Sequence, residues 1–286
     1  MHKGTLLTSF VSMLSIQCSN PLNWPESPLY NTPPLQQQWN PPETILEAMS
    51  AIEGRYAHYD IVAYEERDGE TPFNSFIVSY GFTEFYIENG QLVERDSFCH
   101  AEQKNNYKNV ETEFSDAATQ AILPKEQVVD LFFQDNTWHI YRPATPTLLG
   151  IKGDPQQPLS MDPNDPQIFD ADGDGKPGVT VRMSFNRIIK GSIYITRREI
   201  FNNHLKLHSN GNIYGYVEDY SEQFVVGASH KILERQVNPP QHEDYGLSPI
   251  ILVPISDSID SCDELMKHRD LFFPPEPEFV DPNTES

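Results

Sequence analysis

The chain has 286 residues, of which 38% are hydrophobic and 11% aromatic, values typical of a globular protein with a sizeable core. The 42 Asp and Glu residues outnumber the 20 Lys and Arg residues, which gives a formal net charge of -22. A negative field of this size repels nucleic acid and attracts divalent cations, so we exclude nucleic acid as a partner.

The first 18 residues have the pattern of an export signal. Lys3 precedes a short apolar run that ends at Cys18. This run is shorter than the roughly 20 apolar residues that cross a membrane. It resembles bacterial lipoprotein signals, in which such a Cys carries the lipid, although Gln17 stands where those signals have a small residue. We therefore expect residues 1–18 to be a signal peptide with a lipid on Cys18; the alternative is a secreted protein cleaved near residues 15–19.

Residues 19–42 are rich in Pro, Asn and Gln, a composition typical of a semi-extended tether. A tether would suit the space between a lipid anchor and a globular body. The alternative is a strap that lies on the domain and contacts it through Trp24, Tyr30 and Trp39. The sequence leaves both arrangements open.

Residues 43–272 are expected to form a single β-rich domain. After one or two helical turns at Glu43–Ser50, nearly every pattern indicates a strand. Apolar and polar residues alternate from Val179 to Asn186 and again around Leu205 and Leu207, the period of a half-buried strand. The same interpretation predicts further strands at Tyr56–Glu66, Ser75–Tyr80, Thr83–Glu88, Gln91–His100, Val128–Phe133, Trp138–Arg142, Gly191–Phe201, Ile213–Glu218 and Gln223–Gly227.

The connections favour sequential hairpins. Asn89-Gly90 and Asn210-Gly211 are the strongest hairpin patterns, Asp135-Asn136 is a third, and Asp68-Gly69 opens a longer turn. About ten strands joined in this way predict an all-β antiparallel meander, closed as a β-barrel or folded as a sandwich. Closure would also remove exposed strand edges.

Two cysteines remain if Cys18 carries a lipid. Cys99 and Cys262 are an even number in an oxidising compartment, which favours a disulfide between them. Two independent buried thiols are the alternative. Cys99 is followed by His100 and Glu102, but neighbours on a strand point to opposite faces, so a half-cystine is favoured over a nucleophile.

A long loop at residues 143–169 contains six prolines and leads into an acidic loop at residues 170–178. Asp170, Asp172 and Asp174 alternate with small residues in that loop, as in the first half of a calcium-binding loop. The Lys176 carbonyl would add a backbone ligand, and Asp162 or Asp165 could complete the set. We expect weak, structural calcium binding here; the alternative is an acidic turn without a metal.

An EF-hand is excluded at this loop. Pro177 and Gly178 prevent a following helix, and Val181 stands where an EF-hand has its closing glutamate. The loop is more similar to strand-to-strand calcium loops of extracellular modules.

The C-terminal part is expected to contain little further regular structure. Residues 234–249 are irregular, and Ser261 is placed to cap a short helix. Residues 273–286 are rich in Pro and Glu and are expected to be a disordered acidic tail.

The chain carries no motif that indicates catalysis. Nucleophile elbows, paired zinc-binding histidines, phosphate loops and dinucleotide fingerprints are absent from the sequence. His58, Asp60 and His139 fall in strand patterns and are interpreted as rim or core residues. His204 and His208 share one strand face and are a weaker candidate for metal binding.

Several segments of the chain resemble a group of uncharacterised bacterial envelope lipoproteins. These segments are Ser97–Glu102, Asp170–Val181, Gln223–Ser229 and Cys262. The resemblance spans most of residues 50–270 and implies an exported β-rich domain, on the outer membrane, in the periplasm or at the cell surface. Gly54 and Tyr56 also resemble the Gly-x-Trp opening of lipocalin-like barrels, with Tyr in place of Trp. This resemblance implies a calycin-like β-barrel.

These observations lead to three hypotheses on function. The first is a lipid-anchored or periplasmic binding or structural module, whose barrel could hold a small apolar ligand or contact an envelope protein. The second is an envelope hydrolase with a calcium-supported site, which inward-facing carboxylates or histidines would favour. The third is an architectural surface protein, favoured if the strands enclose no pocket.

Overall fold

The computed structural model describes residues 21–36, 38–67, 72–236 and 238–283. The predicted signal peptide, Cys18 and the Asp68-Gly69 turn lie outside the described residues. Within the described ranges, no helix is both long and apolar enough to cross a membrane.

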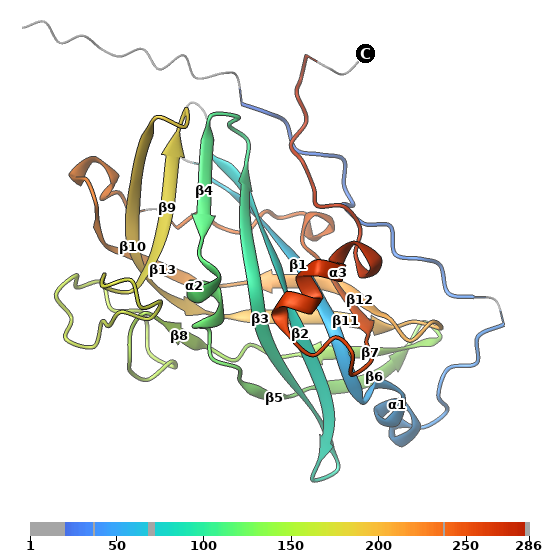
Figure 1. Ribbon diagram of the computed structural model, residues 1–286. Coiled ribbons are helices and arrows are strands. Elements are labelled where there is room, and N and C mark those ends of the chain that lie inside the picture. Colours follow the sequence, from blue (N-terminus) through green and yellow to red (C-terminus); the bar gives the residue numbers. More distant parts are fainter. Residues whose placement is uncertain (1–20, 37, 68–71, 237, 284–286) are drawn as a thin grey trace, which may run out of the picture.

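The strands form one antiparallel sheet that curls into a half-barrel (Figure 1), which confirms the predicted all-β antiparallel fold. Twelve of its strands follow the order β13-β10-β9-β4-β3-β2-β1-β14-β12-β11-β7-β6, while β5 pairs with β3 and β8 with β10. Their bounds are β1 (Gly54–Glu65), β2 (Asn74–Glu88), β3 (Gln91–Asn105), β4 (Val110–Phe114), β5 (Glu126–Val128), β6 (Asp130–Gln134), β7 (Thr137–Arg142), β8 (Thr147–Leu149), β9 (Val179–Phe185), β10 (Ile189–Glu199), β11 (Phe201–Leu207), β12 (Ile213–Asp219), β13 (Glu222–Ala228) and β14 (Pro249–Pro254).

The predicted hairpins are present where the sequence indicated them. Asn89 and Gly90 join β2 to β3 with φ angles of 51° and 77°, and Asp135 and Asn136 join β6 to β7 with φ angles of 50° and 60°. These left-handed conformations match the twist of the flanking strands. Asn210-Gly211 connects β11 to β12.

The strands differ from the prediction in several places. β4 was not predicted, and β8 lies within the stretch expected to be a loop at residues 143–169. The expected break between Tyr80 and Thr83 is absent: β2 is continuous, and β3 has a bulge opposite the step from Tyr80 to Gly81. A further strand, β14 (Pro249–Pro254), lies between β1 and β12 and was not predicted. It begins at the last residue of the stretch expected to be irregular, residues 234–249. This strand was missed because it is buried on both faces, and so shows no alternation, and because a proline lies at each end.

The helices begin at capped positions. In α1 (Ile45–Ile52), the Thr44 side chain accepts from the Glu47 backbone and the Glu47 side chain accepts from the Thr44 backbone. The predicted C-terminal helix is α3 (Cys262–Phe272), with Ser261 as its cap. A short helix, α2 (Asp116–Gln120), was not predicted from the sequence.

Side chains of β1 alternate between two buried faces of the sheet. Tyr56, Val62 and Tyr64 belong to the core of the face that we call the inner face. Tyr59 and Ile61 belong to the core of the opposite, outer face, which α3, the N-terminal segment and the C-terminal segment cover. Because β1 is buried on both faces, it lies at the centre of the fold.

The proline-rich N-terminal segment packs against the domain, as the strap alternative expected. The Trp24 ring lies 5.1 Å from that of Phe76, and Tyr30 stacks on Tyr214 with 5.6 Å between ring centroids. Trp39 packs against the inner core. Aromatic side chains spaced along a Pro-rich chain thus attach it to the sheet.

The expected disorder of residues 273–286 does not hold for the described part, residues 273–283. Phe273 and Phe279 are buried in the outer core. The Glu276 carboxylate accepts from the Tyr80 hydroxyl at 2.6 Å and pairs with the Lys104 ammonium at 2.8 Å. Pro and Glu content suggested disorder, but two phenylalanines and one paired carboxylate are enough to hold this segment on the sheet.

The predicted disulfide joins Cys99 of β3 to Cys262 of α3, with 5.2 Å between their Cα atoms. It fastens α3 to the outer face of the sheet. A disulfide is compatible with an exported protein.

Candidate functional site

A cavity of about 120 Å³ lies on the inner face of the half-barrel. One water molecule needs roughly 10–15 Å³ of such space, so the cavity has room for several waters or a small organic molecule. Both halves of the sheet, on either side of β1 in the strand order, line it: β2, β3, β4, β9 and β10 on one side, and β12, β11 and β7 on the other. Its apolar wall residues include Val62, Ile77, Phe98, Phe114, Leu149, Val179, Ile195, Phe201 and Val217.

A cluster of charged side chains lies in the floor of this cavity, centred on His58 of β1. His58 is 2% exposed. Its Nε2 lies 2.7 Å from Asp60 Oδ2, and its Nδ1 lies 2.7 Å from the Thr83 hydroxyl. Thr83 in turn donates to Asp96 Oδ1 at 2.6 Å. His58 is thus connected to one aspartate directly and to a second through a threonine.

The two aspartates keep His58 protonated. Burial alone would lower the pKa of the imidazole, but hydrogen bonds and charges from Asp60 and Asp96 outweigh it and raise that pKa to about 10. At neutral pH both ring nitrogens therefore carry a proton and donate, which fits the hydrogen bonds to Asp60 and Thr83.

Arg142 of β7 and Glu94 of β3 complete the cluster. We call it the His58 cluster; its members are His58, Asp60, Thr83, Glu94, Asp96 and Arg142. The Arg142 Nε lies 3.3 Å from Glu94 Oε1 and 3.5 Å from Asp96 Oδ2. Burial and the charge of Asp96 raise the pKa of Glu94 well above its usual range. Burial would also raise the pKa of Asp96, but His58 and Arg142 lower it. The surroundings therefore favour the charged form of Asp96 and disfavour the charged form of Glu94.

A second polar pair faces the same cavity from β10. Arg197 Nε donates to Glu199 Oε1 at 3.0 Å, and its Nη1 donates to Gln223. Burial raises the pKa of Glu199, which the charge of Arg197 opposes. The Tyr64 hydroxyl donates to Asp219 beside this pair.

This arrangement was not predicted as a site from the sequence. His58 and Asp60 were interpreted as rim or core residues, without a connection to Glu94, Asp96 or Arg142. One pattern could have revealed it: polar residues separated by two positions recur in predicted strands, as His58 and Asp60, Glu94 and Asp96, and Arg197 and Glu199. Such pairs point to one face of a strand.

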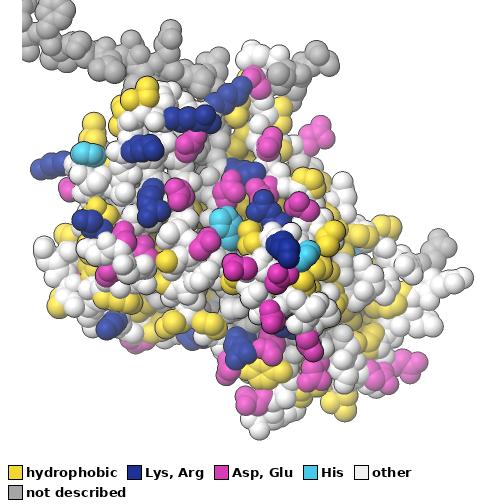
Figure 2. Space-filling view, in the orientation of Figure 1, with side chains coloured by type: hydrophobic (Ala, Val, Ile, Leu, Met, Phe, Trp, Pro, Cys, Tyr) yellow, Lys and Arg dark blue, Asp and Glu magenta, His cyan; other side chains and the backbone are white. Residues whose placement is uncertain are grey.

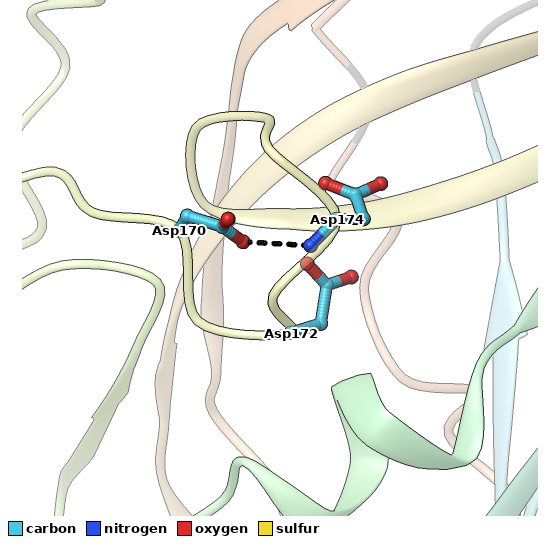
Figure 3. A group of neighbouring side chains, drawn as sticks. All are labelled: Asp170, Asp172 and Asp174. Carbon is cyan, nitrogen blue, oxygen red and sulfur yellow. Dashed lines mark hydrogen bonds between the residues drawn. The ribbon is translucent and has the colours of Figure 1, made fainter.

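The acidic loop brings three of its predicted ligands together. Carboxylate oxygens of Asp170, Asp172 and Asp174 lie within 4.8 Å of one another, an arrangement able to hold a metal ion (Figure 3). Among the described residues, Asp172 Oδ1 is buried and has no hydrogen-bond partner. The group therefore offers at least one oxygen that the protein does not use.

Most of the other carboxylate oxygens in this loop accept hydrogen bonds from backbone N–H groups. Asp170 accepts from the backbone N–H groups of Gly173 and Gly175 at 2.8 Å each, and the Gly175 bond lowers its pKa. The other Asp172 oxygen accepts from the Thr180 backbone at 2.9 Å, and burial raises the pKa of this carboxyl. The loop is thus closed by hydrogen bonds that begin β9.

Asp165, predicted as a further ligand, is not part of this three-carboxylate group. It accepts instead from the Gln167 backbone at 2.8 Å. The Lys176 backbone donates to Asp174 at 2.9 Å. His204 and His208 have aromatic partners: His204 stacks on Tyr216 at 4.7 Å, and His208 meets Tyr214 edge-on at 4.8 Å.

Acidic side chains are spread over the visible surface and interleaved with Lys and Arg, as Figure 2 shows. The chain matches no protein-family model, no curated protein and no solved structure.

Proposed function

We propose that the protein binds a small molecule with a largely apolar body in the cavity of its half-barrel. The observation that carries this proposal is the combination of an apolar wall from both halves of the sheet with a polar floor. Ligand sites commonly combine apolar walls with a few placed polar groups that set orientation.

Binding is better supported than hydrolysis because the carboxylates in the cavity are already engaged. Asp60 is held by His58, Asp96 by Thr83 and Arg142, and Glu199 by Arg197. Ion-pair networks of this kind also perturb pKa values without catalysis. The hydrolase hypothesis would require one of these carboxylates to leave its partner.

The test fills the cavity from a wall position. Ser79→Phe places a ring in the cavity, whereas Ser97→Phe places the same ring on the opposite face of the sheet, because Ser97 lies between the cavity residues Asp96 and Phe98. We expect an environment-sensitive apolar dye to bind the wild type and the control variant but not Ser79→Phe. Equal dye binding by all three folded proteins would contradict the proposal.

We further propose that the acidic loop holds calcium as a structural brace. The unpartnered Asp172 oxygen within the three-carboxylate group favours a cation, and oxygen ligands suit calcium. The affinity would lie in the weak range of extracellular modules, about 10⁻⁴–10⁻³ M.

We also propose that the protein is exported and lipid-anchored at the cell envelope through Cys18. The export-type N-terminus supports this, and the disulfide is compatible with it. Metabolic labelling with a palmitate analogue should mark the wild type and not Cys18→Ser; equal labelling of both would contradict the anchor.

A further inference from the structure

The mouth of the cavity is formed in part by the segment that follows α2. Ile122, Leu123 and Lys125 of this segment line the cavity. Leu123 is nevertheless 74% exposed, so the segment lies between the cavity and solvent. Thr145, on the loop that leads into β8, and Thr147, the first residue of β8, line the cavity as well.

Lys125 connects these two segments. Its Nζ donates to the Pro146 carbonyl at 2.8 Å, and its side chain is half-buried. An ammonium has three donors, so two remain without a protein partner among the described residues. The carbonyl bond fixes the position of the charge without neutralising it.

Lys125 differs from the other cations that line the cavity. His58 faces Asp60 and Asp96, Arg142 faces Asp96, and Arg197 faces Glu199. Within the described part of the chain, Lys125 has no carboxylate within ion-pair distance. The cavity is therefore lined by one more cation than carboxylates, in a protein whose net charge is -22.

An apolar chamber with an uncompensated cation at its mouth is complementary to an amphipathic anion. The apolar part would contact Ile77, Phe114 and Val179, and an anionic headgroup would accept hydrogen bonds from the free N–H groups of Lys125. Hydrogen bonds between an ammonium and an anion are stronger than neutral ones, so the head would add affinity as well as direction.

We propose that the cavity binds an amphipathic anion, such as an alkyl carboxylate, with its headgroup on Lys125 and its apolar chain on the inner face of the sheet. This inference rests on the proposed binding function and names the class of ligand. The polar floor, being internally paired, would serve as the closed end of the chamber.

The experiment compares three ligands with the same chain and different heads: octanoate, octan-1-ol and octylammonium. Dissociation constants are measured by calorimetry for the wild type, for Lys125→Met and for the control Lys190→Met. Methionine retains much of the lysine stem without the charge, and Lys190 is an exposed lysine outside the cavity lining.

In the wild type and in Lys190→Met, octanoate should bind roughly tenfold more tightly than octan-1-ol, and octylammonium should bind most weakly. Lys125→Met should lose the preference for octanoate and keep its affinity for octan-1-ol.

Two results overturn the inference, and they differ in what they leave standing. If octan-1-ol binds but octanoate has no Lys125-dependent advantage, the anion assignment is wrong and the binding function stands. If none of the three ligands binds, both the inference and the proposed function fail.

Discussion

The acidic loop and the His58 cluster both gather carboxylates, but by different means. The loop takes Asp170, Asp172 and Asp174 from five consecutive residues and leaves two of them exposed. The cluster takes its members from β1, β2, β3 and β7, and all six are at most 9% exposed. Local spacing can build a site for an ion, whereas only the folded sheet can build the cluster.

This difference has an energetic consequence. Exposed charges are screened by water and salt, so changes in the loop have small effects on stability. Buried charges depend on their partners, because a charge left unpaired away from water is strongly destabilising.

Loss of the disulfide should have the largest effect. Cys99 lies on β3 three positions after Asp96, so the bridge to α3 holds this strand of the cluster from the outer face. It links residues that are 163 positions apart, and in the chain-entropy model such a link contributes up to about 5 kcal/mol. Reduction, or Cys99→Ser with Cys262→Ser, should lower the free energy of unfolding in urea by a large part of this amount.

Mass spectrometry of the non-reduced protein should first show the cross-linked peptide pair. Alkylation of both thiols without prior reduction would refute the disulfide. The double variant is its own control, because added reductant should leave its stability unchanged.

Replacement of Arg142 should be nearly as disruptive. Arg142→Met removes a buried cation and leaves the Asp96 carboxylate with less positive charge beside it. Removal of one partner of a buried ion pair lowers the free energy of unfolding by about 3–5 kcal/mol. The matched control is Arg182→Met, which breaks the exposed pair with Glu113 and should change stability by under about 1 kcal/mol. Urea unfolding measures both, and equal losses would show that the cluster is not a buried ion-pair network.

The stability of the protein should decrease between pH 7 and pH 9.5 because of His58. Its pKa is about 10 in the folded protein against 6.5 for the free side chain. A raised pKa means that the stabilisation is complete below pH 6.5 and is lost as the pH rises toward 10. The negative charges of Asp60 and Asp96 produce this raised pKa.

His58→Gln should reduce this slope, and unfolding in urea at several pH values measures it. Glu94 contributes with the same sign, because a raised carboxyl pKa also makes stability fall as the pH rises above the ordinary pKa of that group. The control is His208→Gln. Burial lowers the pKa of His208, so the contribution of this residue to stability is lost as the pH falls and not as the pH rises. A slope unchanged by His58→Gln would show that His58 is not protonated.

Much of the sheet could be predicted because its determinants are local. Hairpins at Asn89-Gly90 and Asp135-Asn136 follow from two residues each, and the half-buried strand β9 follows from its alternation. The strand β14 could not be recognised in this way, because a strand buried on both faces has no alternation. The connection between β9 and β10 was not predicted either, because its left-handed residues are Asn186 and Arg187 and not an Asn-Gly pair.

The same distinction between local and long-range determinants applies to the candidate sites. The acidic loop was found because its three carboxylates lie within five residues of sequence. The His58 cluster was not found because Arg142 meets Asp96 only through the order of strands in the curled sheet, in which β7 and β3 are not neighbours. Lys125 lies outside any motif, and its role depends on the cavity beside it.

The smallest expected effect concerns calcium at the acidic loop. With a dissociation constant near 10⁻³ M, 10 mM calcium would stabilise the folded protein by about 1.4 kcal/mol, which corresponds to a rise in Tm of roughly 2–4 °C. A thermal melt with calcium and with chelator measures it. Asp172→Asn should abolish the rise, because Asp172 provides the unpartnered oxygen, whereas Asp165→Asn should retain it, because Asp165 lies outside the group. Equal Tm values with calcium and with chelator in the wild type would show that hydrogen bonds alone close the loop, and a rise lost in both variants would show that the metal site extends to Asp165.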